Sequence, residues 1–247
     1  MSDPGTGGAI RGVVTGAMDY READRIVRLL SASHGRVSLL LRDARRSRRR
    51  FVGLGDVGNE VSVEVRPGRG ELLLVTGGEV LRAPSRARDD LERLALLWYG
   101  AEVCSALAPE GQACERLPRL LEVWIDLLET LTPGSLARTA LEAKALTFAG
   151  LAPSLVRCAA CGERLTDPAV FGHGHGGAMH QGCGEGVRVE ARHLLELEAA
   201  RRTPLADLGA AEGYGGWLLS DFITYQLGRA LLSRALLEEV AQPSPAR

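Results

Sequence analysis

The chain has 247 residues, of which 45% are hydrophobic and 25% are charged, and its formal net charge is −1. This length suits two or three small domains with cores of their own, and the composition is that of a globular protein. No apolar run approaches the roughly 20 residues that span a bilayer, and no signal-peptide segment is apparent, so we expect a cytoplasmic protein without a membrane anchor. Five cysteines, with a close pair at Cys158 and Cys161, favour metal binding over disulfides.

The first 80 residues have the pattern of β-structure. In EVSVEV, the valines at 61, 63 and 65 alternate with polar residues, which is the period of a half-buried strand. The turn Pro67–Gly70 and the apolar segment after it predict a hairpin. Three further apolar segments lie upstream, namely AIRGVVTGAM, ADRIVRLLSA and GRVSLLLRDA. Five short strands predict a small closed barrel, with a sandwich as the alternative.

An arginine-rich stretch, RDARRSRRR, follows the third of these strands at residues 42–50. Residues 1–80 contain 13 Arg and 10 Asp or Glu, whereas residues 81–247 contain 17 Arg or Lys and 21 Asp or Glu. The excess positive charge therefore lies in the N-terminal segment. Guanidinium groups suit phosphate oxygens, and we predict a nucleic-acid-binding loop. The predicted binding residues are Arg42, Arg45, Arg46, Arg48, Arg49 and Arg50, with Arg25 and Arg36 as extensions of the surface. The alternatives are a solvated loop or one that contacts an acidic protein.

The barrel segment contains only two aromatic residues, Tyr20 and Phe51. Base stacking therefore has few platforms there. We predict contacts made mainly to the phosphate backbone, which accept duplex as well as single strands.

From about residue 85 the apolar period becomes helical. The segment DDLERLALLWYGAEVCSALA predicts one buried face, made of Leu91, Leu94, Leu97, Trp98, Ala101 and Cys104. A second helix buries Leu120, Trp124, Leu127, Leu128 and Leu131, and a third covers SLARTALEAKALTFAGL. We expect an irregular, glycine-rich interval at 157–190, and then helices at roughly 190–201 and 215–240.

The irregular interval carries a pattern of metal ligands. Cys158 and Cys161 form a C-x2-C pair, and His180 and Cys183 repeat that spacing, with 18 residues between Cys161 and His180. These four residues predict a closed Cys3His site of the structural zinc type, which has no open position for water. His173 and His175 are rival donors. A bound metal also explains how so glycine-rich a segment is ordered.

No motif of a phosphate-binding loop, a dinucleotide fold or a serine hydrolase is present, and no acidic partner accompanies the metal ligands. We therefore predict no catalytic residue, and the third hypothesis, a zinc hydrolase or deaminase, lacks a general base. A binding protein is the expectation. A zinc-containing adaptor for protein partners, whose arginine loop meets an acidic surface, is the alternative function.

Several segments together resemble the RecO family of bacterial recombination-mediator and DNA-annealing proteins. They are YREADRIVRLL at 20–30, HGRVSLL at 34–40, the arginine-rich loop, EVRPGRGEL at 64–72, and GLAPSLxxCxxCG at 150–162. The resemblance runs over nearly the whole chain, and the order and spacing of the motifs are specific. Family members with four cysteines have C-x2-C in both halves of the zinc site, and this chain departs from them at His180.

The resemblance implies an α+β multidomain protein with a five-stranded OB-fold β-barrel at 1–82 and an α-helical domain at 83–247 that contains a zinc-binding insert at about 155–190. It implies non-catalytic work in DNA repair and recombination. The expected partners are single- and double-stranded DNA, the protein RecR and single-strand-binding protein. The expected location is the cytoplasm, in association with the nucleoid.

Overall fold

The computed structural model describes residues 8–46, 51–68, 70–214 and 216–241. The chain folds as two units: the first contains residues 1–129 and 233–247, and the second contains residues 130–232. The domain boundary expected between residues 82 and 83 coincides with the end of the last barrel strand. The helices between this strand and residue 129 belong to the same unit as the barrel. The residues expected to form one helical domain are therefore divided between the two units.

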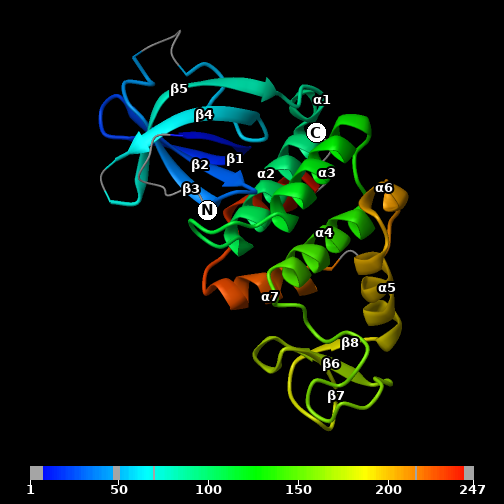
Figure 1. Ribbon diagram of the computed structural model, residues 1–247. Coiled ribbons are helices and arrows are strands. Elements are labelled where there is room, and N and C mark those ends of the chain that lie inside the picture. The colour runs from blue at the N-terminus through cyan, green and yellow to red at the C-terminus, as the bar shows by residue number, and fades with distance from the viewer. Residues whose placement is uncertain (1–7, 47–50, 69, 215, 242–247) are drawn as a thin grey trace. The chain divides into compact units, whose positions relative to one another are not determined.

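The N-terminal part of the first unit is a closed five-stranded barrel, as predicted. Figure 1 shows its strands, coloured from blue to teal, curving around into a barrel. The strand order is β1-β2-β3-β5-β4, and β4 pairs again with β1. All neighbours are antiparallel except β3 and β5, whose short parallel pairing closes the barrel. The strands are β1 (Gly8–Tyr20), β2 (Asp24–Ser31), β3 (Gly35–Leu41), β4 (Glu60–Pro67) and β5 (Leu72–Arg82).

The barrel core follows from alternation along the strands. In β4 the three valines at 61, 63 and 65 are buried and the intervening residues are not, which confirms the predicted period of two. In β3, Val37, Leu39 and Leu41 point inward in the same way. Each fully buried side chain of this kind contributes about 1.5–3 kcal/mol relative to its exposed state. The strands are therefore fixed in register by one continuous apolar core.

Helices complete the first unit. Its second long helix, α3, buries four of the five residues predicted for its apolar face, whereas Leu131 follows the end of the helix and is half-buried. Trp124 is fully buried, and its indole N–H donates to the Leu96 carbonyl oxygen at 3.0 Å. The side chain of Asp90 caps α2 by accepting from the Arg93 N–H at 2.9 Å. These helices are α1 (Arg86–Asp89), α2 (Leu91–Leu107), α3 (Arg116–Thr130) and α8 (Leu232–Ala241).

The predicted buried face of α2 was partly wrong. Leu91 is 61% exposed and Trp98 is 45% exposed, whereas the neighbouring Tyr99 is fully buried. Since α2 is apolar around most of its circumference, the sequence period does not select one face. The buried surface of this helix is set by the elements that pack on it.

The segment expected to be helical over 215–240 contains two helices, α7 (Leu218–Leu227) and α8. Gly228 separates them, and its φ of +64° is a left-handed conformation that ends a helix and that glycine adopts without strain. The chain then returns to the first unit, where Glu102 of α2 accepts from the backbone N–H of Ser233 at 2.8 Å and from its hydroxyl at 2.6 Å. A carboxylate thus caps the N-terminal end of α8.

Glu102→Ala is expected to lower the free energy of unfolding by about 1–2 kcal/mol, because two partly buried donors lose their acceptor and the helix end loses a favourable charge. Urea titration followed by circular dichroism measures the change. Glu239→Ala is the matched control, since Glu239 is exposed on α8, and it is expected to change stability by less than about 0.5 kcal/mol. Equal effects of the two substitutions would contradict the capping role.

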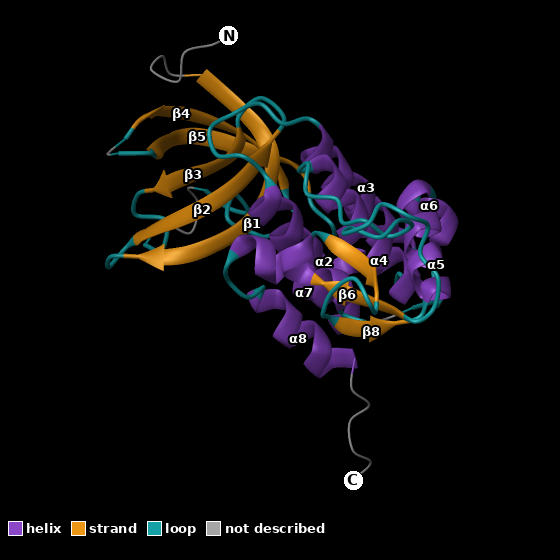
Figure 2. Ribbon diagram, turned by 90° about the horizontal axis from the view of Figure 1, so that it is seen from below, coloured by secondary structure: helices purple, strands orange, loops and turns teal. Residues whose placement is uncertain are grey.

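The second unit contains helices and a small sheet. The helices are α4 (Ser135–Phe148), α5 (Ala191–Arg202), α6 (Leu205–Leu208) and α7, and a 3-10 turn, η1, covers His173–His175. The interval expected to be irregular contains three strands in the order β7-β6-β8, drawn in orange in Figure 2. They are β6 (Ala169–Gly172), β7 (Gly177–His180) and β8 (Val187–Val189). No helix of the described residues has the length and apolarity to cross a membrane.

The small sheet has an apolar core that the glycine-rich sequence conceals. Phe171 of β6 and Met179 of β7 are fully buried. The Phe171 ring also meets the Phe222 ring of α7 edge to face, with 5.7 Å between the centroids. Packing against α7 therefore orders part of the insert independently of any metal.

Candidate nucleic-acid interface and metal centre

The arginine-rich loop starts where β3 ends. Arg25 of β2 pairs with Leu41 of β3, so the turn between β1 and β2 lies beside the first residues of the loop. The backbone N–H of Asp43 donates to the Asp24 carboxylate at 3.0 Å, and that of Arg45 donates to the Ala23 carbonyl oxygen at 3.0 Å. The start of the loop is therefore held on the β1–β2 turn.

Acidic side chains at the end of β1 and on the β1–β2 turn pair with three of the predicted arginines. Asp19 lies 3.1 Å from Arg25 and 3.4 Å from Arg45, and Glu22 lies 3.3 Å from Arg46. Within the loop sequence itself, Asp43 is the only acidic residue, so the sequence analysis did not predict that Asp19 and Glu22 would neutralise these arginines. Exposed ion pairs of this kind are worth at most about 1 kcal/mol. Phosphates can therefore replace the carboxylates, and the pairs hold the guanidinium groups at one end of the barrel.

The other predicted arginines have different surroundings. Arg42 is exposed directly after β3, and no carboxylate in the described part of the chain lies within ion-pair distance of it. Arg36 is near the opposite end of β3, about 20 Å away along the strand, where it pairs with Glu110 at 2.9 Å. The structure therefore does not bring Arg36 to the loop. Arg48, Arg49 and Arg50 lie outside the described residues.

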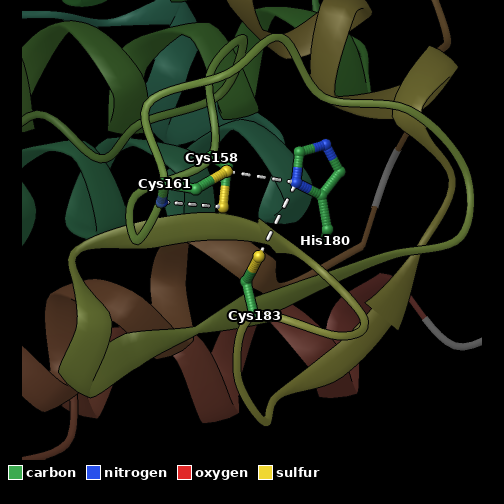
Figure 3. Close-up of side chains that lie close together, drawn as sticks. All are labelled: Cys158, Cys161, His180 and Cys183. Atoms are coloured by element: carbon green, nitrogen blue, oxygen red, sulfur yellow. Dashed lines mark hydrogen bonds between the residues drawn. The ribbon is translucent and has the colours of Figure 1, made fainter.

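The four predicted metal ligands come together in the second unit. Cys158 and Cys161 lie on the loop before β6, His180 ends β7, and Cys183 is on the turn that follows. Figure 3 shows the four side chains pointing toward one another. Their ligand atoms all lie within 4.8 Å of one another. A tetrahedral zinc site with Zn–S bonds of about 2.3 Å has S–S edges of about 3.8 Å, so a small contraction produces it.

Backbone contacts fix the two halves of this cluster. The Cys161 N–H points at the Cys158 sulfur at 3.5 Å, and the turn closes at Gly162, whose φ is +78°. The backbone N–H of Ala159 donates to the Ala178 carbonyl oxygen at 2.8 Å, which attaches the first half to β7. The spacing of each pair therefore becomes a turn that presents two ligand atoms.

The ring of His180 is oriented as a metal ligand requires. Its Nε2 lies 3.1 Å from the carbonyl oxygen of Arg164, which only accepts, so Nε2 carries the proton. Nδ1 then has a free lone pair and faces the Cys161 sulfur at 3.5 Å and the Cys183 sulfur at 3.9 Å. A hydrogen bond from the second ring nitrogen to a carbonyl is the usual outer-shell contact of a metal-bound histidine.

The rival histidines are not in the cluster. His173 stacks against Phe222 and Tyr225 of α7, with ring centroids 6.4 Å and 6.2 Å apart. His175 is exposed in η1 and is not among the grouped ligands. Within the described chain, the structure thus gathers the set Cys158, Cys161, His180 and Cys183.

The pKa values of two thiols in the cluster are shifted in opposite directions, and a bound cation would favour the thiolate form of both. Burial opposes the charge of Cys158, but backbone N–H groups, including that of Cys161, bring the pKa of its thiol down to about 6. Burial and the neighbouring sulfurs raise the pKa of Cys183 to about 11. The thiolate of Cys158 is thus favoured, and its proximity disfavours ionisation of Cys183. A divalent ion removes that repulsion and deprotonates its ligands, so the donor set fits a metal.

Two protein-family models together match almost the whole chain. The family model described as Recombination protein O N terminal matches residues 9–84, and the one described as Recombination protein O C terminal matches residues 88–235. Relatives called DNA repair protein RecO include one from Anaeromyxobacter sp. (strain K), 38% identical over 94% of this chain and 96% of the relative. Those of Geobacter sulfurreducens and Myxococcus xanthus are 35% and 33% identical over 92% of this chain and 96% of each relative.

Proposed function

The chain belongs to the RecO family of DNA repair proteins, and we propose that it binds single- and double-stranded DNA and anneals complementary strands. The observation that carries the proposal is the position of the arginine loop. Arg42, Arg45 and Arg46 project from one end of a small barrel of the kind that binds nucleic acids. Guanidinium groups contact phosphates whatever the sequence, so the binding is independent of the bases.

Annealing needs charge neutralisation and no chemical step. Two complementary strands repel each other through their phosphates, and arginines that contact both lower this repulsion and release counterions. Holding the strands together also raises their local concentration. Base pairing then supplies the specificity. The protein is accordingly proposed to be non-catalytic and to act in the cytoplasm on nucleoid DNA.

Two protein partners are part of the proposal. We infer that the chain cooperates with RecR and acts on strands coated by single-strand-binding protein, so that recombinase can be loaded. These two partners are proposed because the chain belongs to the RecO family. The barrel at residues 1–82 is proposed to bind DNA, which leaves the helical residues 83–247 to contact proteins.

The Cys3His cluster is proposed to hold a structural Zn²⁺. Cys158, Cys161, His180 and Cys183 would occupy all four tetrahedral positions, which leaves none for water or substrate. Such an ion would join the loop before β6 to the end of β7. Its role in this proposal is to fix the shape of the insert.

A second candidate is an adaptor whose arginine loop binds an acidic protein. The contacts of Arg45 and Arg46 with Asp19 and Glu22 favour it, because they show that carboxylates satisfy these arginines. The two functions differ in their preferred polyanion. An adaptor would bind an acidic polypeptide more tightly than DNA at equal salt.

The proposed function is tested with fluorescently labelled DNA. Titrating the full-length protein into single-stranded and duplex oligonucleotides should give binding to both, weakening steeply as salt rises. Addition of RecR should shift the elution of the protein in size-exclusion chromatography. Polyglutamate that competes more strongly than DNA would favour the adaptor, and absence of DNA binding at low salt would exclude the proposal.

A further inference from the structure

Two of the four proposed zinc ligands lie at the surface of the insert. Cys161 and Cys183 are exposed, whereas Cys158 is only 2% exposed. A zinc site holds its cysteines as thiolates, and the susceptibility of a thiolate to oxidation follows its access to solvent. A small oxidant in solution can therefore reach the sulfurs of Cys161 and Cys183, while the insert shields the sulfur of Cys158.

The two exposed cysteines come from different segments but lie close together. Cys161 is on the loop before β6, and Cys183 is on the turn after β7. Figure 3 shows their side chains pointing toward a common centre, and their sulfurs belong to the ligand atoms that all lie within 4.8 Å of one another. The S–S distance of a disulfide is about 2.05 Å, so the two sulfurs need to approach by at most about 2.8 Å.

Glycines beside both cysteines allow this approach. Gly162 follows Cys161 and has a φ of +78°. Gly182 and Gly184 flank Cys183. Among the described residues, no atom beyond the adjoining residues lies within 4 Å of the position that a Cβ would take at Gly162 or at Gly182. The two turns therefore border open space, and they can close on each other without displacing a packed side chain.

We propose that Cys161 and Cys183 form an oxidation site, where a hydroperoxide converts the two thiolates into a disulfide and the bound Zn²⁺ is released. This inference rests on the proposed zinc site and adds that the site responds to oxidants. The disulfide removes two of the four ligands of the cluster. Cys158 and His180 remain, and two ligands do not make the closed tetrahedral set of a structural zinc site.

The oxidation takes place in two steps. The first thiolate attacks the hydroperoxide, so that an S–O bond forms as the O–O bond breaks, and the leaving alkoxide takes up a proton to become an alcohol. The second thiolate attacks the sulfur of the resulting sulfenic acid, so that the S–S bond forms and hydroxide leaves, with a second proton, as water. Two thiolates, one hydroperoxide and two protons thus become one disulfide, one alcohol and one water.

The disulfide connects the same two segments that the ion connects. The loop before β6 and the turn after β7 therefore stay joined when the metal leaves. The contact between Phe171 and Phe222 lies outside the cluster and is not affected. Oxidation is thus expected to leave the insert folded, with a covalent cross-link in place of the metal, and a dithiol reductant should reverse it.

The test uses full-length, zinc-loaded protein and hydrogen peroxide, with a chromogenic chelator that reports released metal. We expect release of about one Zn²⁺ per chain, loss of two of the five free thiols, and recovery of both after addition of dithiothreitol and Zn²⁺. The melting temperature of the oxidised protein should exceed that of reduced protein from which a chelator has removed the metal.

The position of the disulfide is determined by mass spectrometry. Cys158 and Cys161 fall in the same tryptic peptide, between Arg157 and Arg164. The mass of the linked peptides therefore does not distinguish these two cysteines, and fragment ions are needed to do so. We expect the fragment ions to assign the link to Cys161 and Cys183.

Two matched variants retain four metal ligands. Cys161→His removes one exposed thiol, so that within the cluster a sulfenic acid at Cys183 can pair only with the buried Cys158, and zinc release should be at least about 10-fold slower. Cys158→His keeps both exposed thiols and should release zinc at about the rate of the wild type. If the buried imidazole prevents metal binding in Cys158→His, the wild-type disulfide and the rate of Cys161→His decide the question.

Three results would overturn the inference. The first is a zinc-loaded wild type that keeps its metal in peroxide. The second is metal release without a link between Cys161 and Cys183, whether the thiols are lost irreversibly or Cys158 is the partner. The third is a Cys161→His variant that releases zinc as fast as the wild type. In each case the protein still binds zinc, so the proposed metal site survives, whereas a wild type that takes up no zinc removes that site itself.

Discussion

Replacing Cys158 with serine is expected to lower the affinity of the insert for Zn²⁺ by at least about 100-fold, because the closed site loses one of its four ligands. Metal content after size-exclusion chromatography should fall from about one ion per chain to nearly none. Cobalt substitution gives a second reading, since a tetrahedral thiolate site has strong visible absorption that the variant should lack. The second unit should remain folded, because Phe171 and Phe222 pack independently of the ion.

Four further variants identify the ligand set. Cys114→Ser is a matched cysteine substitution, since Cys114 lies outside the cluster, and it should leave metal content unchanged. His180→Ala should reduce metal affinity as Cys158→Ser does, whereas His173→Ala and His175→Ala should not. Full metal content in the His180 variant, or in the Cys158 variant, would contradict the proposed site.

Simultaneous substitution of Arg42, Arg45 and Arg46 by alanine is expected to weaken DNA binding by about 100-fold at moderate salt, because three phosphate contacts are lost. The slope of log Kd against log salt should fall by about 2–3 on duplex. The barrel core is not touched by these exposed residues, so the melting temperature should change little. Electrophoretic mobility or anisotropy at several salt concentrations measures both quantities.

The chain provides a control with the same change of charge. Arg11, Arg36 and Arg82 are also barrel arginines, each paired with a carboxylate, but they are not in the loop. Their triple alanine variant should keep most of the affinity and most of the salt slope. Equal losses in the two triple variants would mean that net charge, and not the loop, governs binding.

Features that depend on local pattern were predictable from the sequence. The alternation of Val61, Val63 and Val65 predicts β4, and the amphipathic period around Trp124 predicts α3. The spacing of Cys158 and Cys161 predicts one half of the metal cluster, because a tight turn is local. The choice of His180 over the other histidines also rested on spacing, and the structure brings His180 to the cysteines.

Features that depend on segments far apart in the chain were missed. The carboxylates of Asp19 and Glu22 lie more than 20 residues before Arg45 and Arg46, and only the pairing of β2 with β3 brings them together. Arg42 and Arg66 likewise line one groove on the outside of the barrel only because the parallel pairing of β3 with β5 closes the barrel. The sheet of the insert escaped detection because its glycines hide a small core around Phe171.

Strand annealing is measured directly as the rate at which two complementary labelled strands pair in the presence of the full-length protein. We expect the wild type to accelerate pairing at low salt, the acceleration to decline as salt rises, and the Arg42, Arg45 and Arg46 triple variant to lose most of it. The Arg11, Arg36 and Arg82 variant should retain it. A wild type that binds both strands yet leaves their pairing rate unchanged, or a loop variant that anneals at the full rate, would contradict the proposed annealing function.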